Sequence, residues 1–263
     1  MKRLKNGISI PSKKLIFIII PIVFILLISL SIYLSYPNKN KPNFKSIINI
    51  SERKKAFIDY LIPLIHQTQK EILNKREKLK TIKQAYIKNH SLSFFELRQL
   101  KSLSKDYQTD FDENNLNKTI NQLLLKINTI PTGMVIAQAA LESGWGTSRF
   151  AVNGNNYFGE HCFRKGCGIV PKKRDHGKIN EVKLFDSPLD SVKSYFNLLN
   201  TGSKFMQFRK LRAQLEKENH TLKGTQLIKT LLHYSELKND EYEKRLLATI
   251  NYKRLDRYYK VSI

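Results

Sequence analysis

Glu142 is the residue whose position most favours chemistry. It follows the apolar, alanine-rich run Met134–Leu141 and precedes Ser143-Gly144-Trp145-Gly146. Pro131 before this run and Gly144 after it predict a buried helix whose last turn holds Glu142. The unpaired carbonyl groups of that turn and the apolar surroundings both disfavour a negative charge, so we expect a raised pKa for Glu142. A carboxyl group that keeps its proton near neutral pH suits general acid catalysis of glycosidic bond cleavage.

The elements that position Glu142 are expected to be mainly helical. Apolar residues recur at helical spacing from Ser51 onward, and Ser93 with Glu96 three residues later has the form of a capping box. The amino-acid composition changes after Ile130. Most of the eleven glycines, the single tryptophan and both cysteines lie in the following 60 residues. Helical periodicity then returns toward the C-terminus. The loops that build a site are therefore expected in the segment after Ile130.

The N-terminal region carries a predicted membrane-spanning segment. Leu15–Tyr36 is an uncharged run of 22 residues, which is long enough to cross a bilayer. Basic residues before it favour a cytoplasmic N-terminus and place the remainder on the extracytoplasmic side. The run is longer than the apolar core of a cleaved signal peptide, which favours an uncleaved signal anchor. The expected location is the cytoplasmic (inner) membrane, with a single pass.

The formal net charge of +24 indicates an anionic partner, and only five of the 46 basic residues precede Tyr36. Outside the cytoplasm we expect anionic lipid head groups or acidic wall polymers as partners, and no nucleic acid. The alternative is a compositional bias toward lysine, with the charge spread over a solvated surface.

Several other classes of site lack their motifs. The sequence has no Gly-x-Ser-x-Gly elbow and no His-Glu-x-x-His, and Gly154–Gly159 lacks the Lys-Ser/Thr of a phosphate-binding loop. No cofactor is predicted.

Four segments around Glu142 resemble the signature of the bacterial peptidoglycan N-acetylglucosaminidase family. They have the family's order and spacing, and they are Ala137–Gly146, Asn155–Gly159, Cys162–Gly168 and Glu181–Ser187. Within the family they are most similar to the Bax-type proteins, and Glu52–Phe57 extends the resemblance upstream. The resemblance implies a mainly α, α+β fold, with a lysozyme-like helical core and a small β-lobe, and peptidoglycan as substrate.

The resemblance also implies roles for individual residues. Glu142 would donate a proton to the glycosidic oxygen, and Tyr234 would face the cleft as a catalytic residue. The expected sugar-binding residues lie close to Glu142 in the sequence, where aromatic faces would suit sugar rings, and they are Trp145, Asn156, Tyr157 and Phe158. For Trp145 and Tyr157 the alternative role is packing in the core.

Glycosidases commonly need a second carboxyl group. Glu181 is the favoured candidate, since it lies 39 residues after Glu142 and just before the strand-like Val182–Phe185. Asp175 and Glu160 are weaker candidates. Alternatively, the acetamido group of the substrate attacks and no second protein carboxylate is needed.

Cys162 and Cys167 are separated by four residues in a glycine-bearing loop. On the oxidising side of a membrane this spacing favours a local disulfide. A zinc site with His161 and His176 is the alternative, but only half of the usual paired spacing is present. No metal is predicted.

The patterns and the resemblance together predict five segments. They are a basic cytoplasmic tail (1–14), a transmembrane signal anchor (15–36), a linker (37–50), a helical accessory segment packed on the core (51–117) and a glucosaminidase catalytic domain (118–263).

The expected activity is hydrolysis of the β-1,4 bond between N-acetylglucosamine and N-acetylmuramic acid in cell-wall glycan strands. Two alternatives remain. A lytic transglycosylase would also use one glutamate at a helix end, although it typically has Gly-Leu-Met-Gln where this chain has Asn156-Tyr157-Phe158-Gly159-Glu160. A wall-binding protein without activity would retain the fold alone.

Overall fold

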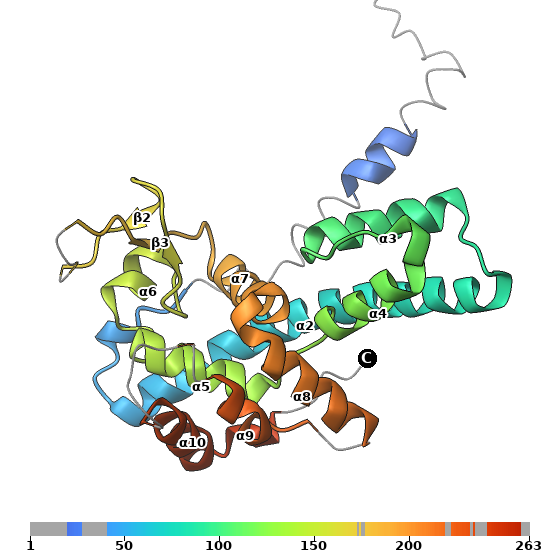
Figure 1. Cartoon of the computed structure of the whole chain (residues 1–263). Helices are drawn as coiled ribbons and strands as arrows, with labels where there is room; N and C mark the ends of the chain where they lie inside the picture. The colour runs from blue at the N-terminus through green and yellow to red at the C-terminus, as the bar shows by residue number, and fades with distance from the viewer. Residues whose placement is uncertain are drawn as a thin grey trace, which may run out of the picture. The chain divides into compact units, whose positions relative to one another are not determined.

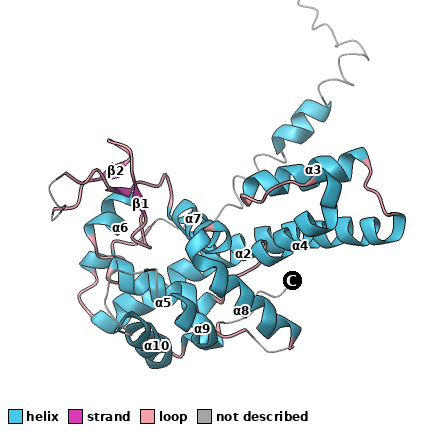
Figure 2. Ribbon diagram, in the orientation of Figure 1, coloured by secondary structure: helices cyan, strands magenta, loops and turns pink. Residues whose placement is uncertain are grey.

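The computed structural model describes residues 20–27, 41–172, 174, 177–218, 222–231, 234 and 241–258. The chain divides into two units, Met1–Lys41 and Pro42–Ile263. The second unit is mainly helical, with short strands gathered at one end (Figures 1 and 2).

The main helices of the second unit are α2 (Ile50–Asn89), α3 (Phe94–Asp106), α4 (Leu116–Lys126), α5 (Thr132–Ser143), α6 (Arg149–Gly154), α7 (Pro188–Thr201), α8 (Met206–Lys217), α9 (Gly224–Leu227) and α10 (Glu241–Lys253). The strands are β1 (His161–Cys162), β2 (Gly168–Ile169) and β3 (Glu181–Lys183). Short 3₁₀ helices are η1 (Phe44–Ser46), η2 (Glu113–Asn115), η3 (Ser203–Phe205), η4 (Ile228–Leu231) and η5 (Leu255–Arg257). This arrangement of a helical core with a small sheet matches the sequence-based expectation.

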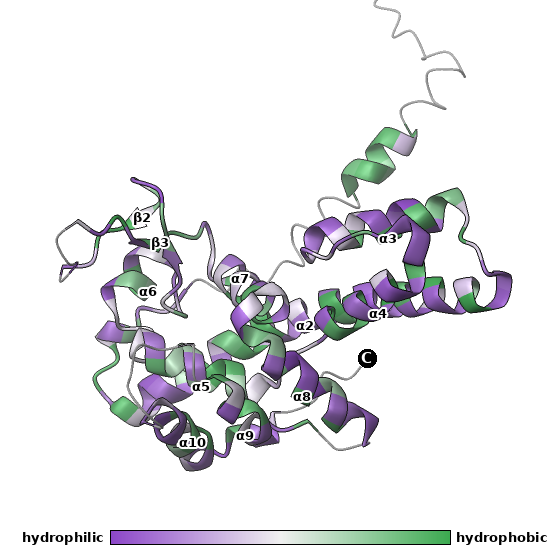
Figure 3. Cartoon of the chain, in the orientation of Figure 1, coloured by the Kyte–Doolittle hydropathy of each residue, from purple (hydrophilic) through white to green (hydrophobic). Residues whose placement is uncertain are grey.

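The predicted transmembrane helix over residues 15–36 is corrected by the structure. Within that range the described residues form a helix over 20–27, which is apolar along most of its length (Figure 3). The rest of the range lies outside the described residues. No helix in the described part of the chain is both long and apolar enough to cross a membrane. A single-pass location in the inner membrane, and attachment through such a helix, are therefore not supported.

Helix α5 lies at the centre of the core because it is apolar on all sides. Its residues Thr132–Ala140 are all buried, as expected for a helix without a polar face. Helices α2, α10 and η5 pack around it. Gly133 permits the closest of these approaches, since a Cβ atom there would lie 2.6 Å from the carbonyl oxygen of Leu255. Helix α5 is therefore held from several sides.

Helix α2 joins the core to an arm of three helices. Its N-terminal half contributes Phe57, Leu61 and Ile65, which are fully buried, to the core. Its C-terminal half continues into the arm formed with α3 and α4 (Figure 1). The predicted capping box at the start of α3 is confirmed, because Ser93 and Glu96 exchange both hydrogen bonds.

The three strands form an antiparallel sheet in the order β1-β3-β2. Cys162 of β1 lies opposite Glu181 of β3, and Gly168 of β2 lies opposite Lys183. Gly168 is needed at this position because a Cβ atom would collide with the carbonyl group of Val182. The sheet thereby holds the segments before and after the β-lobe loop together.

Arg212 of α8 is a buried cation that satisfies the carbonyl groups at the end of α4 and just beyond. Its Nη2 donates to the carbonyl of Leu125 at 3.0 Å, and its Nη1 donates to that of Thr129 at 3.0 Å. Nη1 also donates to Oδ1 of Asn200 in α7 at 2.8 Å. The last carbonyl groups of a helix have no partner within the helix, and Arg212 supplies donors to this region together with Arg76, which donates to the carbonyls of Leu124 and Ile127.

We predict that Arg212→Met lowers the free energy of unfolding by about 2–4 kcal/mol, because it leaves several buried acceptors without donors. Urea denaturation measures the change. Arg245→Met is the matched control, since Arg245 forms an exposed i,i+4 pair with Glu241 and its loss should change stability by less than about 0.5 kcal/mol. Equal effects of the two substitutions would contradict the assigned role of Arg212.

Candidate active site

A tight left-handed turn follows α5 just after Glu142 and Ser143. Gly144, Trp145 and Gly146 all have positive φ angles, of 56°, 58° and 78°. The hydroxyl of Ser143 closes the turn by accepting the N–H of Gly146 at 2.8 Å. Glycine suits this left-handed backbone, so the Gly-Trp-Gly pattern after Glu142 is explained by the turn.

The carboxyl group of Glu142 is largely removed from water. Its Oε1 accepts a hydrogen bond from the hydroxyl of Tyr242 at 3.0 Å. Its Oε2 lies against Gly159, where a Cβ atom would be 3.3 Å away. Burial raises the pKa of Glu142, and the hydrogen bond from Tyr242 lowers it in part. The direction agrees with the sequence-based prediction, and the protonated form of Glu142 is favoured to a higher pH than in an exposed glutamate.

Tyr242 connects Glu142 to a buried chain of hydrogen bonds. Its hydroxyl accepts from Nε2 of Gln138 at 2.9 Å, and Oε1 of Gln138 accepts from the hydroxyl of Tyr195. Burial raises the pKa of Tyr242, so its hydroxyl remains a donor. Sequence analysis missed Tyr242, Gln138 and Tyr195. A signal existed in Gln138, a lone amide within an apolar run, because a buried amide requires partners.

Tyr234, which is expected from the sequence to be catalytic, packs against Tyr242 and bonds to the backbone of Phe158. Its hydroxyl donates to the carbonyl oxygen of Phe158 at 2.9 Å. Its ring lies nearly parallel to that of Tyr242, with centroids 6.0 Å apart. In this structure the tyrosine that contacts Glu142 is Tyr242.

Three of the four predicted sugar-binding residues are buried. Asn156 holds its own loop together by donating to the carbonyls of Glu160 and Lys183, each at 2.9 Å. Tyr157 is fully buried, and Phe158 stacks on Tyr195 with centroids 4.2 Å apart. These side chains shape the loop from inside the core.

Trp145 is the half-buried member of the predicted sugar-binding set. Its indole packs edge-on against Phe57, with ring centroids 5.7 Å apart. The ammonium group of Lys54 lies 5.0 Å from its ring centroid and the same distance from that of Tyr252. The aromatic surface of Trp145 is therefore partly occupied by its own chain.

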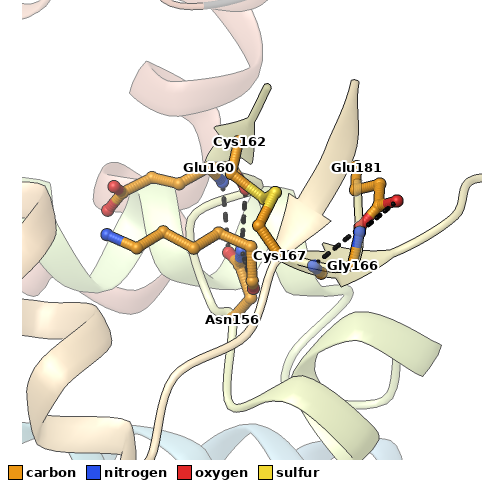
Figure 4. Close-up of a disulfide and its surroundings, with 8 residues drawn as sticks. Asn156, Glu160, Cys162, Gly166, Cys167 and Glu181 are labelled. Atoms are coloured by element: carbon orange, nitrogen blue, oxygen red, sulfur yellow. Dashed lines mark hydrogen bonds between the residues drawn. A yellow bond between two sulfur atoms is a disulfide. The ribbon is translucent and has the colours of Figure 1, made fainter. Parts of the chain in front are cut away.

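Cys162 and Cys167 form a disulfide that closes the loop between β1 and β2 (Figure 4). These cysteines and Glu181 form the group of potential metal ligands found among the described residues. Disulfide sulfurs are not the thiolates that zinc requires, so this set does not fit the zinc alternative. His176 and Asp175 lie outside the described residues.

Glu181 is engaged by the backbone of the disulfide loop. Its Oε1 accepts the N–H of Gly166 at 3.0 Å and its Oε2 accepts that of Gly168 at 2.8 Å. These hydrogen bonds lower the pKa of Glu181. Both oxygens of the favoured second carboxylate therefore stabilise the β-lobe.

The comparisons with known proteins identify the family. Residues 117–255 match the family model described as Glucosaminidase, mannosyl-glycoprotein endo-beta-N-acetylglucosaminidase. The chain belongs to this family and is a hydrolase of the glycosidase class.

Among its relatives is Protein bax of Escherichia coli (strain K12), which is 35% identical over 214 residues. The match spans 81% of this chain and 74% of that protein. The Bax-like resemblance is thereby confirmed. A solved structure, the catalytic domain of the autolysin Auto (Lmo1076) from Listeria monocytogenes, matches with a TM-score of 0.38 and 20% identity, over 68% of this chain and 96% of that one.

We predict that Tyr242→Phe raises the pKa of Glu142, because it removes the hydrogen bond that favours the charged carboxylate. A carbon-13 NMR titration of the Glu142 carboxyl measures this pKa. Tyr234→Phe is the matched control, since the Tyr234 hydroxyl bonds to the Phe158 carbonyl and should leave the titration unchanged. An unchanged pKa in Tyr242→Phe would refute the assignment.

The lowered pKa of Glu181 predicts a pH-dependent contribution to stability. This contribution is present above the pKa of an unfolded glutamate and is lost as pH falls through the lowered folded pKa. Glu181→Ala should therefore lower the thermal midpoint at neutral pH, and the difference from the parent should shrink below about pH 4. A difference that is constant between pH 3 and 7 would contradict this account.

Proposed function

We propose that the chain hydrolyses the β-1,4 bond after N-acetylglucosamine in peptidoglycan, with Glu142 as the general acid. The observation that carries this proposal is the partly buried carboxyl group of Glu142, whose pKa is raised and whose Oε1 accepts a hydrogen bond from Tyr242. A protonated carboxyl group can give its proton to the leaving oxygen as the bond breaks. The relationship to a glucosaminidase family supports the choice of substrate.

For the attacking group we propose the acetamido group of the substrate. This choice is supported by Glu181, whose two oxygens are engaged by backbone N–H groups. The acetamido carbonyl oxygen would bond to C1 of the sugar while the C1–oxygen bond breaks and the leaving oxygen takes the proton of Glu142. Water would then open the resulting ring, return a proton to Glu142 and leave a reducing N-acetylglucosamine end.

A lytic transglycosylase is the second candidate, because it also needs one carboxylic acid; it cleaves the bond after N-acetylmuramic acid, and the C6 hydroxyl of that sugar takes the place of water. It would produce anhydro-muramic ends without consuming water. The net charge of +24 also supports binding to an anionic wall surface. The identity of the released ends separates the two reactions.

We predict that Glu142→Gln reduces digestion of purified peptidoglycan by at least about 100-fold, since the amide has no proton to donate. Mass spectrometry after borohydride reduction identifies the ends made by the parent. Reducing N-acetylglucosamine ends support the hydrolase, whereas anhydro-muramic ends would replace it with the transglycosylase.

The control for Glu142→Gln is binding to insoluble peptidoglycan, which should be the same for the variant and the parent. A parent that binds the wall and releases no product would contradict an enzymatic function.

A further inference from the structure

The two carboxyl oxygens of Glu160 have unequal surroundings. Oε2 accepts a hydrogen bond from the hydroxyl of Ser194 at 2.7 Å, and this hydroxyl accepts one from the ammonium group of Lys183 at 3.2 Å. Oε1 is buried and has no hydrogen-bond partner among the described residues. A buried polar atom without a partner is unfavourable and uncommon, so this oxygen requires an explanation.

The unpaired oxygen belongs to a residue beside the proposed acid. Glu160 follows Gly159 directly, and Gly159 lies against Oε2 of Glu142. The charges of Glu142 and Glu160 both act on the hydroxyls of Tyr195 and Tyr234. The two carboxyl groups therefore lie close enough to the same two tyrosines to raise the pKa of each.

A purely structural role does not account for Glu160. The backbone of Glu160 is already fixed by Asn156, which accepts its N–H at 3.1 Å and donates to its carbonyl at 2.9 Å. Glu181 offers the comparison, because its structural role uses both of its oxygens. Figure 4 shows that the side chain of Glu160 points away from the disulfide and from Glu181. The loop is thus complete without the free oxygen of Glu160.

We propose that Oε1 of Glu160 accepts a hydrogen bond from the acetamido N–H of the sugar whose bond Glu142 cleaves. This inference rests on the proposed function. The acetamido group is attached to C2, the carbon next to the reacting C1, so a single sugar would meet both carboxyl groups. Accepting the N–H increases the electron density on the acetamido carbonyl oxygen, which is the atom that attacks C1. Glu160 is therefore a substrate-contacting residue, held in place by Ser194 and Lys183.

The proposal implies that glycan binding depends on pH. The titratable groups that face Glu160 are Lys183 from β3, Tyr195 from α7 and Tyr234, with Glu142 acting on the same tyrosines. Burial raises the pKa of Glu160, while Ser194 and Lys183 lower it in part. A donor at Oε1 favours the charged form. The KM of the parent should therefore fall as pH rises through the pKa of Glu160.

Two variants test the proposal in steady-state kinetics on soluble glycan strands between pH 4 and 8. Glu160→Gln cannot titrate, so its KM should lose the pH dependence of the parent. Glu160→Met removes the acceptor, so its KM should rise about tenfold at the upper end of the range. The fall of kcat that follows deprotonation of Glu142 should remain in both. Glu113→Gln, an exposed glutamate of η2, is the matched control.

The outcomes separate this inference from the proposed function. A parent that cuts glycan, together with a Glu160→Gln variant whose KM keeps the parental pH dependence, would overturn the inference and leave the function intact. The inference is likewise overturned if both variants lower the thermal midpoint without changing KM. A parent that releases no product would overturn the proposed function itself.

Discussion

The partly buried carboxyl group of Glu142 at the end of α5 sets the requirements for this structure. Burial raises the pKa of Glu142, and residues 132–140 of α5, which lead up to it, are all buried. Among the described residues, a side-chain hydrogen bond to its carboxyl group comes from Tyr242, which lies 100 residues later in the chain. The fold must therefore bring α10 back onto α5. The tyrosines and Gln138 then keep that contact in a fixed direction.

The β-lobe meets a different requirement, because a short loop with few apolar residues cannot build a core of its own. The loop after β1 is closed by the disulfide of Cys162 and Cys167 and by the backbone hydrogen bonds to Glu181. Asn156 stabilises the preceding loop by donating hydrogen bonds to the backbone carbonyls of Glu160 and Lys183. In these loops, polar side chains and a disulfide thus take the place of hydrophobic packing.

The features that could be predicted from the sequence are those set by residues close together in the chain. The helix of Glu142, the direction of its pKa shift and the capping box at Ser93 all follow from residues close together in the chain. Tyr242 was missed because its partner is distant in sequence. Asn156 and Phe158 carry the family pattern, yet their side chains face inward, which a motif alone does not reveal. The N-terminal span was predicted from the length of an apolar run, whereas no helix in the described part of the chain is long and apolar enough to cross a membrane.

The buried guanidinium of Arg212 also determines how the second unit comes apart. It joins the end of α4, the segment leading into α5 and a side chain of α7 to its own helix α8. None of these segments can leave without stranding polar groups in the interior. The stability of the arm, through the end of α4, is therefore coupled to that of the core by one buried side chain.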